Sequence, residues 1–150
     1  MSERRIAVLH GVNLNMLGLR DPAHYGTLTL SELEAAIAES AAEVGVNTEF
    51  FQTNHEGAYV ERLQLARGRA DGLILNPGAW THYSWAIRDA LELTELPAVE
   101  VHLSDINARE EFRRTSVIAD LCVGTVAGRG AEGYADALAL LARHLQETAA

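Results

Sequence analysis

Hydrophobic and polar positions alternate in blocks along the chain, and the blocks predict its elements. Short apolar runs typical of buried strands occupy residues 5–10, 46–52, 72–76, 98–102 and 121–126. Longer segments between and after them favour helices over residues 31–44, 57–69, 81–94, 107–113 and 131–147. Strands that alternate with helices form a parallel sheet covered on both faces. The pattern therefore predicts a doubly wound α/β fold, and a length of 150 residues favours a single domain over residues 1–150.

The connection after the first strand is unusually long for a fold of this kind. Thr29 and Glu32 have the spacing of a capping box, which marks the start of the first helix, and Gly45 fits its end. The pattern therefore predicts a loop over residues 11–28. Loops of this length inside compact domains usually carry function.

Polar and titratable side chains gather just after four of the predicted strands. They are Asn13, Asn15, Arg20 and Tyr25 after the first, Asn54, His55 and Glu56 after the second, Asn76 and His82 after the third, and Glu100, His102, Ser104, Arg109 and Arg113 at or after the fourth. Open parallel sheets bind ligands beyond the carboxyl ends of their strands. The convergence predicts an active site at that edge.

Composition narrows the chemistry. All twelve basic residues are arginine, so Schiff-base catalysis by lysine is excluded. A net charge of −9 disfavours nucleic acid as a partner, and an anionic substrate would need a local pocket of arginines. The sequence shows no secretory signal and no apolar run long enough to span a membrane, which favours the cytoplasm. The single cysteine, Cys122, falls within the fifth predicted strand and is expected to be unreactive.

Three stretches contain candidate catalytic groups. Glu100 and His102 are two apart on a strand, so they share a face and form either an acid whose tautomer is fixed or a structural ion pair. Tyr25 beside Arg20 is either a general base on a mobile loop or a packing residue. His82 is either a ligand-binding or a capping residue.

The stretch from Asn76 to Asp89 yields several local expectations. Pro77 and Gly78 form a turn, and Thr81 is expected to cap the following helix. Arg88 and Asp89 are expected to form a pair of charged residues at the surface of that helix. The three aromatic residues in this stretch are expected to pack against a neighbouring element or subunit, and they are Trp80, Tyr83 and Trp85.

Known cofactor motifs do not fit the chain. Four histidines lie near strand ends without the HExxH spacing of a zinc site, and the first loop lacks the GxGxxG pattern of dinucleotide binding. A Ser-His-Asp hydrolase would need a GxSxG turn, which is also missing. No metal or organic cofactor is expected.

Five stretches, in order along the chain, resemble type II 3-dehydroquinate dehydratases. They are HGVNLNMLGLRDPAHYG, FFQTNHEGAYVERL, ILNPGAWTHYSWAIRDAL, VEVHLSDINAREEFRRTS and GTVAGRGAEGY. The resemblance implies a flavodoxin-like five-stranded sheet and conversion of 3-dehydroquinate to 3-dehydroshikimate through an enolate, in the shikimate or quinate pathway. It also implies a homo-oligomer, a dodecamer built of four trimers.

The resemblance also implies a role for each site residue. Tyr25 would be the base, stabilised by Arg20, and His102, oriented by Glu100, would be the acid. Asn13 would hold a water molecule against the enolate. The substrate would be bound by the side chains of Asn76, His82 and Arg113 and by the backbone amides of Leu103 and Ser104, while Asp89 would reach the site of a neighbouring subunit.

Five positions depart from the pattern of this family, and they are Val12, Tyr83, Trp85, Asp105 and Asn107. Asp105 and Asn107 stand where asparagine and histidine are expected, and they motivate an alternative, a lyase for another β-hydroxy ketone. A second alternative is a non-catalytic protein that senses a cyclic polyol acid. A flavodoxin-like electron carrier is a third, disfavoured by the first loop.

Overall fold

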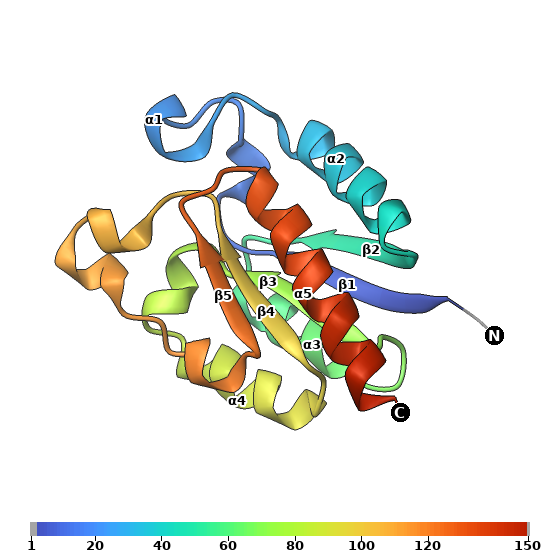
Figure 1. Ribbon diagram of the computed structural model, residues 1–150. Helices are drawn as coiled ribbons and strands as arrows, with labels where there is room; N and C mark the ends of the chain where they lie inside the picture. The colour runs from blue at the N-terminus through green and yellow to red at the C-terminus, as the bar shows by residue number, and fades with distance from the viewer. Residues whose placement is uncertain (1–2, 150) are drawn as a thin grey trace.

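The computed structural model describes residues 3–149, and its centre is a five-stranded parallel sheet (Figure 1). The strands are β1 (Arg4–His10), β2 (Val46–Gln52), β3 (Gly72–Asn76), β4 (Ala98–His102) and β5 (Gly124–Ala127). Their order across the sheet is β2-β1-β3-β4-β5, and every neighbouring pair is parallel. This is the flavodoxin-like order, so the predicted fold class is confirmed.

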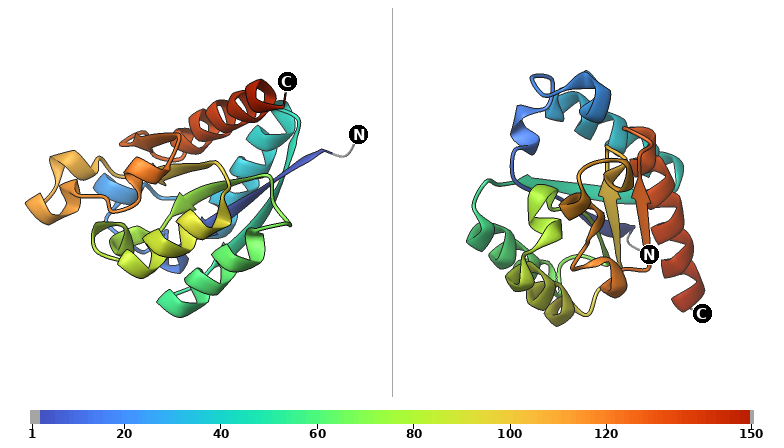
Figure 2. Two further views of the ribbon diagram at one scale, coloured as in Figure 1. Left: turned by 90° about the horizontal axis from the view of Figure 1, so that it is seen from below. Right: turned by 90° about the vertical axis from the view of Figure 1, so that its left-hand side faces the viewer.

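Helices cover both faces of the sheet. Figures 1 and 2 show α2 (Leu30–Glu43) and α5 (Glu132–Thr148) on one face and α3 (Glu56–Ala66) and α4 (Trp85–Thr94) on the other. Alternate strand residues separate two apolar cores: Val8 and Ile74 pack towards α2 and α5, whereas Leu9 and Leu75 pack towards α3 and α4. Both faces of the central strands are therefore buried, which explains their nearly continuous apolar sequence.

The first long helix begins where its capping residues predict. The Thr29 hydroxyl accepts from the Glu32 amide at 3.2 Å, and the Glu32 carboxylate accepts from the Thr29 amide at 3.0 Å. Gly45 follows the helix with φ of +74°, the left-handed conformation that favours glycine. Within the long first loop the chain forms a further short helix, α1 (Pro22–Tyr25), which the sequence pattern did not predict.

The predicted helix over residues 81–94 starts later than expected. The structure has a 3₁₀ turn at Gly78–His82 and then α4, whose cap is Ser84; its hydroxyl accepts from the Ile87 amide at 3.1 Å. The prediction that Thr81 caps this helix is therefore wrong. Thr81 is fully buried, and its hydroxyl contacts the carboxylate of Glu100 instead.

The segment between β4 and β5 contains no α-helix. The predicted helix over residues 107–113 is replaced by two 3₁₀ turns, Ile106–Ala108 and Glu111–Arg114. The predicted start of the fifth strand is also wrong, because Ala119–Leu121 forms a third 3₁₀ turn and β5 begins only at Gly124. Cys122 thus precedes the strand, where burial raises the pKa of its thiol to about 12. A thiol with that pKa stays protonated, in agreement with an unreactive cysteine.

Candidate active site

The carboxyl ends of β1, β3 and β4 surround a cavity of about 110 Å³. β2 and β3 lie on opposite sides of β1, so the strand order reverses between β1 and β3. The cavity lies at this reversal, where ligands bind in this kind of fold. Most of the side chains singled out in the sequence line it, together with one that had no assigned role; they are Asn13, Arg20, Tyr25, Asn76, His82, His102, Leu103, Ser104, Arg109 and Arg113. Glu100 is buried behind the cavity wall, and Asp89 is exposed on α4 outside the cavity lining.

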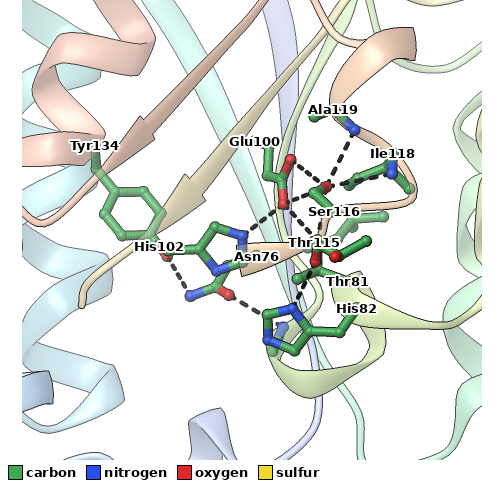
Figure 3. Close-up of polar contacts among 12 residues, drawn as sticks. Asn76, Thr81, His82, Glu100, His102, Thr115, Ser116, Ile118, Ala119 and Tyr134 are labelled. Atoms are coloured by element: carbon green, nitrogen blue, oxygen red, sulfur yellow. Dashed lines mark hydrogen bonds and ion pairs between the residues drawn. The ribbon is translucent and has the colours of Figure 1, made fainter. Parts of the chain in front are cut away.

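Glu100 and His102 form a hydrogen-bonded pair at the end of β4 (Figure 3). Their alternation along the strand places both on one face, and His102 Nε2 lies 2.6 Å from Glu100 Oε2. Burial would raise the pKa of Glu100, but hydrogen bonds from His102, Thr81 and Ser116 and the charge of His102 lower it overall. A carboxylate that accepts from Nε2 fixes the tautomer of His102 and leaves Nδ1 for a ligand.

Two arginines contact Tyr25, which lies in the long connection after β1. The Arg20 guanidinium lies 3.7 Å above the centre of the Tyr25 ring, and Arg109 Nη1 lies 2.5 Å from the Tyr25 hydroxyl. Arg109 also reaches the Ser104 hydroxyl at 3.4 Å. Burial and the neighbouring arginines lower the pKa of Arg20 while Tyr25 raises it, yet an arginine remains charged at any working pH. Arg20 thus contacts the ring face of Tyr25, and Arg109 contacts its hydroxyl.

Arg109 is the functional residue that the sequence reasoning missed. The sequence places it just after the fourth strand and predicts no role for it, and stabilisation of the phenol was expected from Arg20 alone, whereas Arg113 was expected to bind substrate hydroxyls. In the structure Arg113 lines the cavity while its Nε donates to Glu110 at 2.6 Å. The only available signal was a second arginine four residues before Arg113.

Asn76 and His82 lie on the two sides of the Pro-Gly turn and both reach the cavity. Asn76 Oδ1 accepts from the Gly78 amide at 3.1 Å, while Nδ2 lies 3.5 Å from the Tyr134 hydroxyl. His82 Nδ1 lies 2.8 Å from the carbonyl of Thr115, so Nδ1 carries the proton and donates it. Burial lowers the pKa of His82, which leaves Nε2 as a neutral acceptor for a ligand hydroxyl.

Asn13 occupies a tight turn after β1, anchored to the neighbouring strand. Its φ is +69°, a left-handed conformation that asparagine tolerates better than most residues. The Asn13 amide donates to Asn54 Oδ1 at 2.8 Å, and the Gln52 side chain donates both to Asn54 Oδ1 and to the Gly11 carbonyl at 3.1 Å. These bonds hold the turn and present Asn13 at the cavity.

Comparison with known proteins identifies the family. The family model of class II dehydroquinases matches residues 4–142. The chain belongs to the class II dehydroquinases. It is 52% identical over 145 residues to 3-dehydroquinate dehydratase 2 of Pseudomonas putida, with 97% of each chain covered. It is 47% identical over 142 residues to a catabolic 3-dehydroquinase of Verticillium alfalfae, with 95% of each covered.

Solved structures agree. The crystal structure of the type II dehydroquinase from Propionibacterium acnes superposes with a TM-score of 0.89 at 42% identity, covering 95% of this chain and 99% of that one. As a class II dehydroquinase, the chain is an enzyme of the hydro-lyase type.

Among residues 3–149, no group of three or more His, Cys, Asp or Glu side chains is placed to hold a metal ion. No helix in this part of the chain has the length and apolarity to cross a lipid bilayer.

The residues that depart from the class II dehydroquinase pattern mostly lie outside the cavity. Asp105 is exposed and caps a 3₁₀ turn, where its carboxylate accepts from the Asn107 amide at 3.1 Å. Neither residue lines the cavity, whereas Val12 does. Tyr83 and Trp85 are more than half exposed, so they do not pack against a neighbouring element of the same chain, and their packing against a neighbouring subunit stays a prediction.

Two further expectations for this region have clear outcomes. Trp80 is buried and packs edge-on against Tyr59, with the ring centres 5.7 Å apart, so its packing against a neighbouring element is confirmed. The prediction that Arg88 forms a surface pair with Asp89 is wrong. Arg88 instead forms two hydrogen bonds with Asp120, at 2.5 and 2.9 Å, and donates to the Val117 carbonyl.

Proposed function

We propose that the chain removes water from 3-dehydroquinate to give 3-dehydroshikimate, in the shikimate or quinate pathway, without a metal or organic cofactor. The observation that carries this proposal is one cavity lined by both a phenol and an imidazole, each held by its own charged partner. Tyr25 is held by arginine and His102 by carboxylate. Elimination from a β-hydroxy ketone needs a base and an acid, and these two groups fit the roles.

The reaction follows from these groups in two steps. The phenolate of Tyr25 removes a proton from the carbon beside the ketone, and the electron pair moves to the ketone oxygen as an enolate. Asn13 holds a water molecule that donates a hydrogen bond to this oxygen. His102 then protonates the hydroxyl on the β-carbon, the carbon–oxygen bond breaks, and water leaves as the enone forms. Glu100 stabilises the charged imidazole before it gives up its proton.

Substrate binding uses the remaining groups of the site. Asn76, His82 and Arg113 would bind ring hydroxyls, and the amides of Leu103 and Ser104 would bind the carboxylate. The substrate is an anion and the chain carries a net charge of −9, so attraction depends on local charge. Arg20, Arg109 and Arg113 all line the cavity and supply it.

An ultraviolet assay tests this function. The purified enzyme is mixed with 3-dehydroquinate, and the absorbance of the conjugated enone is followed over time. We expect turnover by the wild type and a loss of about 10²- to 10⁴-fold in kcat for Tyr25→Phe and for His102→Ala, the contribution typical of a general base or acid. Turnover that survives Tyr25→Phe would remove the phenol as base. Binding without turnover by the wild type would instead favour a sensor of cyclic polyol acids.

The structure does not favour the alternative function, a lyase for another β-hydroxy ketone. It rested on Asp105 and Asn107, and neither side chain lines the cavity. A lyase for another β-hydroxy ketone would require changes among the residues that do. The assay still distinguishes the two, because such a lyase would bind 3-dehydroquinate poorly.

The proposal includes an oligomer, a dodecamer of four trimers in the cytoplasm. Asp89 is exposed on α4 and does not line the cavity of its own subunit. Tyr83 and Trp85 near the start of the same helix are exposed as well. Large exposed aromatic side chains are typical of protein interfaces, so this face supports contact with a second copy.

A further inference from the structure

The irregular segment at residues 115–117 lies beside both His82 and Glu100, and Figure 3 shows its residues Thr115 and Ser116 next to these two side chains. The carbonyl of Thr115 accepts from His82 Nδ1 at 2.8 Å. The Ser116 hydroxyl donates to Glu100, and the Val117 amide donates to the Thr81 carbonyl at 2.8 Å. The segment therefore connects the turn that carries His82 with the strand that carries Glu100.

The hydroxyl of Ser116 is held so that its proton faces Glu100. Its oxygen accepts from the amides of Ile118 at 3.3 Å and Ala119 at 3.1 Å. A hydroxyl has two acceptor sites and one proton. With both acceptor sites occupied by amides, the proton is left for the carboxylate, whose oxygens lie 2.8 and 3.0 Å away, closer than the Thr81 hydroxyl at 3.3 Å.

Glu100 needs such donors because it is fully buried in the middle of the sheet. A buried carboxylate without partners would take up a proton and become neutral. Three side chains contact it: His102 through Nε2, Thr81 through its hydroxyl and Ser116. Burial raises the pKa of Glu100, and hydrogen bonds from these three groups lower it below its usual value.

The other titratable groups near Glu100 do not supply this stabilisation. Tyr59 on α3 and Cys122 before β5 both feel its charge, and burial raises the pKa of each, so both stay neutral. His82 also feels Glu100, but burial lowers its pKa and its Nδ1 is bonded to Thr115. The two hydroxyls and His102 are thus the groups that keep the carboxylate ionised.

We propose that Ser116 and Thr81 are positioning residues, which hold the ionised Glu100 carboxylate against His102 and so keep His102 oriented for proton donation. The inference rests on the proposed function, in which His102 is the acid. Neither hydroxyl lines the cavity, so both residues act through Glu100 and not on the substrate.

The matched variants are Ser116→Ala with Ser116→Thr, and Thr81→Val with Thr81→Ser. Alanine and valine remove a donor, while threonine and serine keep it. Ser116 partly faces an open groove on the outer surface, which gives the added methyl group of threonine room. Ser84→Ala is the control, because it removes the buried cap of α4 without a contact to Glu100.

Steady-state kinetics across pH provide the first readout. We expect Ser116→Ala and Thr81→Val each to lower kcat about tenfold with little change in KM, since one hydrogen bond to a charged group is lost. Loss of a donor raises the pKa of Glu100, so the acid limb of kcat should move up by about one pH unit. Ser116→Thr and Thr81→Ser should restore both values, and Ser84→Ala should lower stability without moving the limb.

A substrate-free readout separates this inference from the proposed function. The ¹³C chemical shift of the Glu100 carboxyl, followed by NMR during a pH titration, reports its ionisation directly. We expect a higher midpoint in Ser116→Ala and Thr81→Val than in the wild type, with recovery in Ser116→Thr and Thr81→Ser. An unchanged midpoint in both donor-free variants would overturn the inference, as would equal effects of Ser116→Ala and Ser116→Thr. A wild type that titrates as expected but does not convert 3-dehydroquinate would overturn the proposed function alone.

Discussion

Two arginines contact Tyr25 in different ways, and we therefore expect them to have different roles. Arg20 covers the face of the ring, where a cation interacts with the π electrons, whereas Arg109 donates to the hydroxyl that must lose its proton. A hydrogen bond from a fixed cation to a phenolate is stronger than a contact with the ring face. Arg109 should therefore stabilise the reactive form of Tyr25 more than Arg20 does.

Replacing Arg109 tests this at the level of one side chain. We expect Arg109→Gln to lower kcat about a hundredfold at neutral pH, since it removes a charge-assisted hydrogen bond from the base. Arg114→Gln is the control: Arg114 is exposed on the next 3₁₀ turn and does not line the cavity. A loss that is confined to KM would show that Arg109 serves only to bind substrate.

At the level of elements, the site depends on two loops whose backbones touch. The amide of Gly11, just after β1, donates to the Asn76 carbonyl at the end of β3 at 2.8 Å. A Cβ on Gly11 would lie 2.2 Å from the Pro77 carbonyl oxygen, far inside any allowed contact. Glycine at this position lets the loop that carries Asn13 approach the turn that carries Asn76.

Gly11→Ala should force these loops apart. We expect a loss of about 1–3 kcal/mol in the free energy of unfolding, the usual effect of overpacking, together with a higher KM as Asn76 moves. Urea unfolding and steady-state kinetics measure the two effects. Gly57→Ala is a matched control on α3, where an added Cβ meets nothing within 4 Å and alanine favours the helix by up to about 1 kcal/mol. Equal behaviour of the two variants would contradict the close-approach argument.

The elements differ in how well the sequence predicts them, and the reason is physical. Periodicity reports burial, so the central strands and the helices that cover them are predicted to within a few residues. Residues 103–123 have no such period, because 3₁₀ turns and tertiary hydrogen bonds hold them. Arg109 and Ser116 both lie there, and their partners, Tyr25 and Glu100, are distant in sequence. By contrast, the pairing of Glu100 with His102 follows from strand alternation alone.

For the whole molecule, the position of Asp89 is informative. Exposed on α4 and outside the cavity of its own subunit, it can contribute to catalysis only through a second copy of the chain. Isologous or cyclic assembly would bring such a residue to every site at once. If the chain forms the proposed dodecamer, sedimentation should give a mass of about 196 kDa, which is twelve times the 16.3 kDa of one chain.

Mixed oligomers test the contribution of Asp89 directly. His102→Ala should be nearly inactive because each site lacks its acid, and Asp89→Ala should lose about tenfold in kcat/KM because each site lacks a partner's carboxylate. When the two variants are co-assembled, some sites combine an intact His102 with an intact Asp89 of the partner subunit. Activity should then exceed the mean of the two parents, whereas a mixture without subunit exchange should match that mean. If co-assembly also gives only the mean activity of the two parents, Asp89 does not act at the site of a neighbouring subunit.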